Sequence, residues 1–356
     1  MPTTVYRDRR AATIENNELR VTVLQEGGHI AEVFDRQIGV SPLWTPPWPS
    51  IEPSTFDPAR HHEYGDGPDA KLLAGIAGHN LCLDIFGGPS TDEWAAGLTA
   101  HGEGSVAPYQ IDAAATELTM RAILPIAHIR FERRIELHGR AVRIREKIES
   151  LLAFDRAIGW TQHVTLGPPF LENGVTEFRA SATQSQVLER PFGTADYLSV
   201  GASFTWPMAP RAGGGEVDLR RFPGAPTSSA YTAHLMDARR EHAFFVAFHP
   251  ATRLAFGYVW KRADFPWLGI WEENRSRANP PWNAQTIARG MEFGVSPMPE
   301  SRRDMIDRGR LFETPTYCWL PANGRLAVEY WAVMIRVDAI PETLEWPGSE
   351  GPRAKG

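Results

Sequence analysis

Residues 19–34 read LRVTVLQEGGHIAEVF, and this stretch points most directly to the class of fold. Apolar and polar side chains alternate over residues 19–24, which is typical of a β-strand with one buried face. The segment Gln-Glu-Gly-Gly interrupts this pattern, and a second strand-like run follows over residues 29–34. Two such runs around a glycine-containing turn predict a β-hairpin.

The same pattern continues along the chain and predicts an all-β sandwich. Further strands are expected at residues 117–124, 128–136, 142–148, 159–166, 244–248, 254–260 and 326–336. The chain also contains 31 glycines and 29 prolines, which end elements more often than they continue helices. A short helix is expected only at residues 301–309, and residues 211–226 are expected to form a surface loop. No linker divides the chain, so we expect a single domain over residues 1–356, with its core at 14–335 and a loose tail at 345–356.

Composition excludes several classes of protein. The 37 basic and 43 acidic residues give a net charge of −6 without a basic cluster, which argues against a nucleic-acid partner. No apolar stretch approaches the roughly 20 residues of a membrane span, and the N-terminus lacks a signal core. We therefore expect a soluble, cytoplasmic monomer or homodimer without membrane contact. Cys82 and Cys318 are expected to be free thiols, and they form no metal-binding pattern.

Two histidines are candidates for a functional site. His101 lies in the glycine-rich segment TAHGEGS, residues 99–105, where the backbone can approach a ligand closely; the alternative is a histidine in a surface loop. His163 lies in WTQHVTLGPPFLE, residues 160–172, among residues that favour a strand, and Gly167-Pro168-Pro169 cannot continue a sheet. His163 should therefore lie near a strand end, where a pocket can open. Its alternative is a core histidine that bonds a backbone carbonyl.

Glu292 is the third candidate, because it lies in the strand-like run ARGMEFGVSP between Met291 and Phe293. A carboxylate among apolar residues must be paired, neutralised or directed into a cleft. The alternative is a salt bridge to a neighbour such as Arg289. Tryptophans are also frequent in the second half of the chain, and one or two of them could stack on a sugar, although most should belong to the core.

The order of these motifs resembles that of the galactose mutarotase-like superfamily, which includes the aldose 1-epimerases. The resemblance covers roughly residues 14–335 and rests on an ordered set of segments. These are NELRVTV from Asn17, GGHI from Gly27, GHN ending at Asn80, FGGP from Phe86, HGE from His101, residues 160–171, PWLGIW ending at Trp271 and GMEFGVSP from Gly290.

The resemblance implies a large antiparallel β-supersandwich with a sugar cleft and an acid–base mechanism without a cofactor or metal. It makes Glu292 the base that deprotonates the anomeric hydroxyl, His163 the acid that protonates the ring oxygen, and His101 a second histidine near that oxygen. The two histidines could exchange roles. Carboxylates and imidazoles can be tuned toward neutral pH, so we expect a bell-shaped rate profile from deprotonated Glu292 and protonated His163. Expected substrate-binding residues are Asn80, Glu103, Trp160, Trp271 and Glu272.

Two departures from the family bear on the substrate. The well-known galactose mutarotases have the acid histidine in an Asn-His-x-Tyr-Phe context, whereas this chain has Gln162 before His163 and Val-Thr-Leu after it. Galactose is therefore not implied. Glu103 follows the His-Gly motif, where the hexose-6-phosphate branch has basic residues, so phosphosugars are not expected.

Three alternatives come from other classes. A non-catalytic carbohydrate-binding protein would keep the cleft and the tryptophans. A glycoside hydrolase or lyase on the same fold would need Glu103, Glu272 or Glu273 as a second carboxylate beside Glu292. A cupin-like metalloenzyme would draw on His61-His62-Glu63 or His101-Gly-Glu103, but neither segment has the ligand spacing of such a site.

Overall fold

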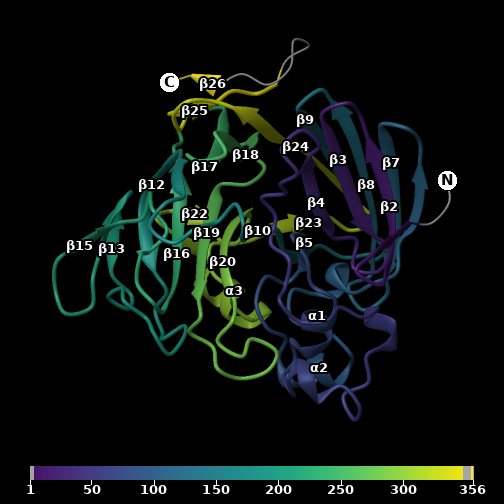
Figure 1. Ribbon diagram of the computed structural model, residues 1–356. Coiled ribbons are helices and arrows are strands. Elements are labelled where there is room, and N and C mark those ends of the chain that lie inside the picture. Colours follow the sequence, from purple (N-terminus) through teal and green to yellow (C-terminus); the bar gives the residue numbers. More distant parts are fainter. Residues whose placement is uncertain (1–3, 348–353, 356) are drawn as a thin grey trace.

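The computed structural model describes residues 4–347 and 354–355, and its main feature is a pair of antiparallel β-sheets packed face to face (Figure 1). The larger sheet has, in spatial order, strands β1 (Thr4–Tyr6), β2 (Arg9–Glu15), β3 (Leu19–Leu24), β4 (Ile30–Asp35), β5 (His79–Asp84), β10 (Arg156–Leu166), β20 (Ile287–Gly294), β19 (Trp267–Asn274), β16 (Ser228–Met236), β12 (Ala182–Val187) and β13 (Ser203–Thr205), with β23 (Cys318–Leu320) paired to the start of β10. The smaller sheet has β11 (Glu177–Ala180), β17 (His242–His249), β18 (Leu254–Lys261), β24 (Arg325–Arg336), β9 (Ala141–Ser150), β8 (Ile129–His138), β7 (Glu117–Leu124) and β6 (Gln110–Ala113).

Short elements connect and flank the two sheets. Three short strand pairs are β14 (Met208–Pro210) with β15 (Glu216–Asp218), β21 (Arg310–Leu311) with β22 (Thr314–Pro315), and β25 (Thr343–Leu344) with β26 (Ala354–Lys355). The helical elements of the described chain are α1 (Ala70–Gly75), α2 (Thr91–Ala95), α3 (Arg302–Arg308), and the 3-10 turns η1 (Pro53–Thr55), η2 (His62–Tyr64) and η3 (Glu103–Ser105).

The predicted all-β sandwich is confirmed, and each strand expected from alternation coincides with an observed strand to within a few residues. The expected helix at residues 301–309 is α3, which Ser301 begins by accepting a hydrogen bond from the backbone N–H of Asp304. The helices α1 and α2 and the strand β15, which lies inside the expected loop at 211–226, are not predicted by the sequence pattern. Most of the tail expected to be loose, 345–356, lies outside the described residues.

Alternation along β10 divides its side chains between two environments. Trp160 and Val164 face the smaller sheet and belong to the main hydrophobic core, which fills the space between the sheets. Gln162 points the same way and joins a buried polar cluster: its Nε2 donates to Glu146 Oε2 at 2.7 Å. Arg133 pairs with the same Glu146 at 2.7 Å, so the buried carboxylate is satisfied. His163 and Thr165 therefore face the opposite side of the larger sheet.

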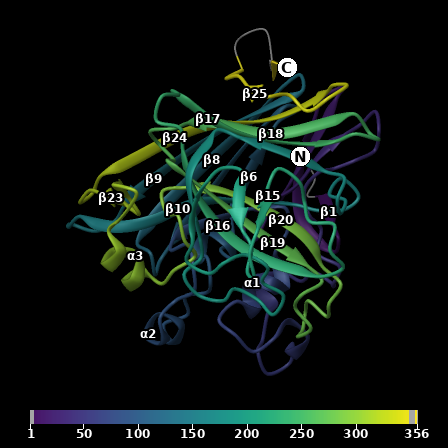
Figure 2. The same cartoon turned by 90° about the vertical axis from the view of Figure 1, so that its left-hand side faces the viewer.

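That outer face carries a second hydrophobic cluster, which includes Trp44, Phe86, Trp271 and Trp282. In Figure 2, α1 and α2 lie on the side of the larger sheet away from β17 and β18. The segment between β4 and β5 contains α1 and covers this face. The cavity described below lies between this covering segment and the sheet.

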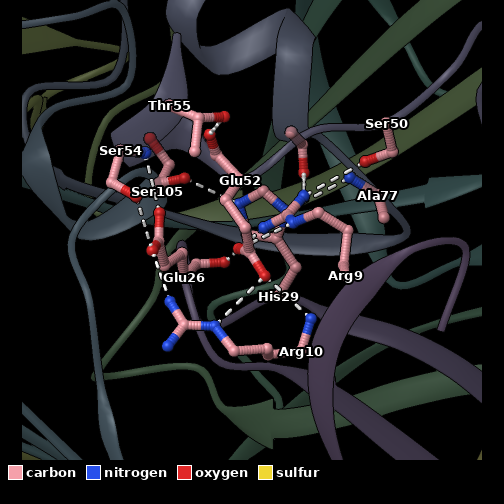
Figure 3. Close-up of polar contacts among 11 residues, drawn as sticks. Arg9, Arg10, Glu26, His29, Ser50, Glu52, Ser54, Thr55, Ala77 and Ser105 are labelled. Carbon is pink, nitrogen blue, oxygen red and sulfur yellow. Dashed lines mark hydrogen bonds and ion pairs between the residues drawn. The ribbon is translucent and has the colours of Figure 1, made fainter. Parts of the chain in front are cut away.

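A polar cluster attaches the covering segment to the N-terminal strands (Figure 3). Buried Arg9 donates from Nε to Glu52 at 2.9 Å, from Nη1 to the carbonyl of Gly75 at 2.9 Å, and from Nη2 to the carbonyl of Glu26 at 2.8 Å. The Glu26 carboxylate accepts from the backbone N–H of Ser54 at 2.7 Å. These bonds fix both ends of the segment that runs from η1 to α1.

His29 belongs to the same cluster and joins two further segments. Its Nε2 donates to the carbonyl of Ser105 at 2.9 Å, and its Nδ1 accepts from the backbone N–H of Ala77 at 3.1 Å. Burial and, to a smaller extent, the nearby Arg9 guanidinium lower the pKa of His29 to about 3. A neutral His29 thus connects the residues just before β5 to the turn that follows His101.

Candidate active site

Asn80, His163 and Glu292 form one row across three neighbouring strands. In the antiparallel register, His163 of β10 is opposite Asn80 of β5 on one side and Glu292 of β20 on the other. Residues directly opposite each other point to the same face, and neighbouring strands are about 4.8 Å apart. The register therefore brings an amide, an imidazole and a carboxylate together on the outer face.

His163 and Glu292 are in direct contact. Nε2 of His163 lies 2.9 Å from Oε1 of Glu292, and the two residues are 5% and 2% exposed. Two glycines leave space for this carboxylate: a Cβ at Gly290 would lie 2.3 Å from Glu292 Oε1, and one at Gly269 would lie 3.4 Å from Oε2. A larger residue at position 290 would collide with the carboxylate.

Glu292 and Thr165 together determine which nitrogen of His163 carries the proton. Oγ1 of Thr165 lies 3.1 Å from Nδ1 of His163. Because a carboxylate accepts and does not donate, the neutral imidazole has its proton on Nε2, facing Glu292, and Nδ1 accepts from the Thr165 hydroxyl. Both nitrogens of His163 are thereby engaged.

His101 approaches the row from the loop before η3. Its backbone has a φ of +65°, an uncommon conformation for a residue with a side chain. The following Gly102 lies so close to β5 that a Cβ would be 2.1 Å from the carbonyl oxygen of Leu83. The loop therefore packs tightly on β5 and holds the His101 ring 4.8 Å from the His163 ring.

Asn80 fixes the orientation of His101. Nδ2 of Asn80 lies 3.3 Å from Nδ1 of His101, and an amide nitrogen can only donate. His101 Nδ1 is therefore the acceptor, and the neutral ring has its proton on Nε2. Burial lowers the pKa of His101 well below its ordinary value, and His163 and His29 lower it further. His101 is consequently a neutral hydrogen-bond donor at pH 7.

The side chains of His101, His163 and Glu292 line a cavity of about 620 Å³, measured with its open mouth. Its walls are mainly apolar and aromatic. They consist of Leu72, Leu73 and Ile76 from the covering segment, Phe86, Ala100, Phe192, Tyr231, Trp271, Trp282 and Pro299. Asp69, His101, His163, Arg277 and Glu292 supply the charged or ionisable groups. A concave, largely apolar site with a few convergent polar groups is typical of a small-molecule pocket.

Of the substrate-binding residues predicted from the sequence, Asn80 and Trp271 lie at this site. Trp271 lines the cavity, and its ring lies 5.8 Å from that of His163. Within the described chain, neither Oδ1 of Asn80 nor Nε1 of Trp271 has a hydrogen-bond partner. Both atoms therefore have unused hydrogen-bonding capacity close to His163.

The structure does not bring Glu103, Trp160 and Glu272 to the cavity. Trp160 faces the main core, where its indole N–H donates to Glu146 at 3.0 Å. The Glu103 carboxylate accepts from the backbone N–H of Ala127 at 2.7 Å, so the inference that it repels phosphosugars does not hold. Glu272 points to the inner side of β19, where Tyr197 donates to it at 2.5 Å. In each case the local direction of the strand or loop points the side chain away from the cavity. The spacing of residues in the sequence does not reveal this direction.

The salt bridge considered as an alternative for Glu292 is not formed. Arg289 instead lies 3.4 Å from Glu272 Oε1, because residues 289 and 292 project from opposite faces of β20. Glu273 is also engaged elsewhere: its carboxylate accepts from the backbone N–H of Ser276 at 2.6 Å. The glutamates considered as hydrolytic partners of Glu292 therefore all serve other contacts.

Sequence reasoning did not identify Asp69, Tyr231 and Arg277, which also line the cavity. Asp69 and Arg277 lie in loops without regular spacing, and nothing in their local sequence distinguishes them from surface charges. Tyr231 donates to the carbonyl of Pro297 at 3.0 Å, and burial raises the pKa of its hydroxyl well above the ordinary value, with Glu292 adding to the effect.

Further observations concern metal ions, membranes and the two cysteines. Among the residues that the structure describes, no three His, Cys, Asp or Glu side chains are grouped so as to hold a metal ion. In the part of the chain described here, no helix is long and apolar enough to span a membrane. Cys82 is buried, and both it and Cys318 are free thiols.

No protein-family model and no curated protein sequence matches this chain. Solved structures do match it. A protein from Klebsiella pneumoniae, provisionally named an aldose 1-epimerase, has a TM-score of 0.64 at 12% identity, covering 94% of this chain and 82% of that one. A similarly named protein from Escherichia coli K12 has a TM-score of 0.60 at 13% identity, covering 92% and 99%. A galactose mutarotase-like protein from Clostridium acetobutylicum has a TM-score of 0.60 at 11% identity, covering 94% and 98%.

The chain therefore has the galactose mutarotase-like fold, as the ordered motifs indicated. At these identities the match concerns architecture and does not transfer an activity. The chemistry has to be argued from the cavity itself.

Proposed function

We propose that the protein interconverts the α and β anomers of a free sugar by acid–base ring opening, as an aldose 1-epimerase does. The observation that carries the proposal is the 2.9 Å contact between Nε2 of His163 and Oε1 of Glu292 at the wall of the cavity. The anomeric hydroxyl and the ring oxygen of an aldose are bonded to the same carbon. An acid and a base that serve both atoms must therefore point to one small region of the cavity, as these two side chains do.

Glu292 acts as the base in the proposed reaction. It takes the proton of the anomeric hydroxyl, while protonated His163 gives its Nε2 proton to the ring oxygen. The bond from the anomeric carbon to the ring oxygen breaks, and a carbonyl forms at that carbon. After rotation about the neighbouring carbon–carbon bond, the ring hydroxyl attacks the other face of the carbonyl. Both protons return to their original groups, so the cycle needs no external proton or electron.

The neighbouring groups orient the sugar. His101 presents its Nε2–H as a neutral donor, since Nδ1 accepts from Asn80. Among the described residues, Asn80 Oδ1 and Trp271 Nε1 have no hydrogen-bond partner, and Trp271 supplies an aromatic surface to the cavity. The apolar walls would exclude water from the open-chain aldehyde.

The test is the rate of anomer interconversion for a panel of free aldohexoses and aldopentoses, followed by polarimetry and saturation-transfer NMR. Acceleration by the protein should fall at least about a hundredfold in Glu292→Gln, which keeps the shape of the side chain and removes its basicity. Glu241→Gln is the matched control, because the Glu241 side chain is 84% exposed and outside the cavity. An unchanged rate in Glu292→Gln would refute the assignment.

The same panel separates the alternatives. Sugar binding without accelerated interconversion would favour a carbohydrate-binding protein. Release of a reducing sugar from a glycoside would favour hydrolysis, for which Asp69 is the other carboxylate at the cavity wall.

A further inference from the structure

Arg277 is held rigidly at the cavity wall by the loop that follows β19. Glu273 organises this loop: its Oε1 accepts from the backbone N–H groups of Ser276 at 2.6 Å and of Arg277 at 3.2 Å. Its Oε2 lies 3.3 Å from Nε of Arg277. One edge of the guanidinium is therefore already occupied by Glu273.

Aromatic rings hold the faces of the same guanidinium. Its central carbon lies 4.6 Å from the centroid of the Trp282 ring and 5.2 Å from that of Phe192. Such contacts are favourable for a cation and restrict its rotation. The Arg277 side chain is 25% exposed and lines the cavity. Within residues 4–347, its two terminal amino groups make no hydrogen bond to the protein.

Asp69 is a second polar group with unused capacity at this wall. It lines the cavity from the residue before α1, and within the described chain its carboxylate accepts no hydrogen bond. Its charge acts on Arg277, so the two lie in the same electrostatic environment. The guanidinium of Arg277, a donor, and the carboxylate of Asp69, an acceptor, thus line one cavity. Both are separate from the row of Asn80, His163 and Glu292.

We propose that the terminal amino groups of Arg277 and the carboxylate of Asp69 determine substrate specificity by binding hydroxyl groups on the part of the sugar that does not react. This inference rests on the proposed function, because it takes the occupant of the cavity to be a sugar. An arginine fork donates two parallel hydrogen bonds and a carboxylate accepts them, so together they match a pair of adjacent hydroxyls.

The charges at the wall favour an uncharged sugar over an acidic one. Asp69 and Glu292 line the cavity, and Glu273 already contacts the one guanidinium there. A carboxylate or phosphate on the substrate would meet the carboxylates of Asp69 and Glu292 in the same cavity. Uronates and sugar phosphates should therefore bind more weakly than the corresponding neutral aldoses.

The experiment compares neutral aldoses with their deoxy derivatives, each lacking one hydroxyl, and with D-glucuronate and D-galacturonate. Binding is measured by titration calorimetry and anomer interconversion by NMR, for the unmodified protein, Arg277→Gln and Asp69→Asn. In the unmodified protein, removing a hydroxyl that Arg277 or Asp69 binds should weaken binding at least about tenfold. In the two variants the ratio of the affinities for the parent sugar and its deoxy derivative should fall toward one. KM should rise, and kcat at saturating sugar should stay nearly unchanged. Circular dichroism establishes that the variants fold, and the two substitutions lie in separate segments.

Each outcome decides the proposal. Discrimination that persists in both folded variants would overturn it, as would tighter binding of the uronates. A fall in kcat with unchanged KM would place the pair in the reaction step and would also overturn it. Sugar binding that depends on Arg277 without interconversion would support this inference and refute the proposed catalysis. If the unmodified protein binds no sugar of the panel, both proposals fail.

Discussion

Nε2 of His163 lies 2.9 Å from Oε1 of Glu292, and the register of β10 and β20 places the two residues directly opposite each other. The site thus holds its proposed acid and base in contact with each other. A bound sugar has to insert its anomeric hydroxyl and ring oxygen at this contact. The reacting atoms therefore meet groups that the sheet has already positioned.

Gly290→Ala should impair catalysis by displacing the Glu292 carboxylate. The added Cβ would lie 2.3 Å from Oε1 of Glu292, and the neighbouring strands leave little room for relaxation. We expect a loss of kcat of about a hundredfold and a loss of unfolding free energy of about 1–3 kcal/mol, typical of overpacking. Steady-state rates and urea unfolding measure both. Gly88→Ala is the matched control, since a Cβ there meets no atom within 4 Å. Equal rates in the two variants would contradict this prediction.

Thr165→Val should weaken catalysis by removing the partner of His163 Nδ1. Valine has nearly the shape of threonine but cannot donate to the ring, so a buried nitrogen is left without a bond. The expected cost is about 1–3 kcal/mol in stability, together with a fall in kcat of about tenfold. Thr165→Ser keeps the hydroxyl and should restore most of the rate. Nitrogen NMR of the imidazole distinguishes the tautomers, and an unchanged spectrum and rate in Thr165→Val would rule out this positioning role.

Asn80→Asp should change the protonation of His101. In the unmodified protein, burial keeps the pKa of His101 well below its ordinary value, so its ring resonances should not titrate between about pH 5.5 and pH 8. A carboxylate beside Nδ1 favours a proton on that nitrogen. We therefore expect His101 in the variant to gain a proton within this range, with reduced kcat. Carbon–proton NMR of the histidine rings measures this, and a His101 that already titrates in the unmodified protein would disprove the prediction.

Stability should fall in mild acid because of buried neutral histidines. Burial lowers the pKa of His29 and of His234 to about 3, whereas in the unfolded chain both should have the ordinary value of 6.5. Well above pH 6.5 the two histidines are neutral in both the folded and the unfolded chain, so the difference in pKa does not change the free energy of unfolding. At lower pH these histidines bind protons in the unfolded chain but stay neutral in the native state. Each histidine then lowers the free energy of unfolding by up to about 1.4 kcal/mol per pH unit, or about 4 kcal/mol for the pair between pH 7 and pH 5.

Urea unfolding at pH 7 and pH 5 measures this loss. His29→Gln should reduce the difference between the two pH values by about 2 kcal/mol, because one of the histidines that gain a proton only in the unfolded chain is removed. His62→Gln is the control, since the His62 side chain is 70% exposed. A pH dependence that is the same in His29→Gln as in the unmodified protein would contradict the assignment.

Much of the fold could be predicted because its strands alternate clearly and its turns are rich in glycine and proline. The helices α1 and α2 were missed because they have six and five residues, too short to show a helical period. Their positions depend on tertiary contacts such as those of Arg9 with Glu52 and Gly75, which no local pattern encodes.

The site was predictable where strand register alone decides it. His163 and Glu292 lie in strands with strong patterns, and the ordered motifs singled out His101 and Asn80. Glu103 and Glu272 could not be excluded from sequence, because the direction of a side chain follows from parity along a strand or from loop geometry. Glu272 and Trp271 are neighbours in sequence and face opposite sides of β19.

The alternation along β10 also bears on how such a protein can diversify. Trp160, Gln162 and Val164 serve cohesion between the sheets, whereas His163 and Thr165 serve the cavity. Selection on one set of positions leaves the other set free. The loops that carry Asp69 and Arg277 lie outside both sets, so substitutions that alter the proposed sugar preference would leave the interior unchanged. That separation is compatible with a shared architecture among proteins only 11–13% identical to this one.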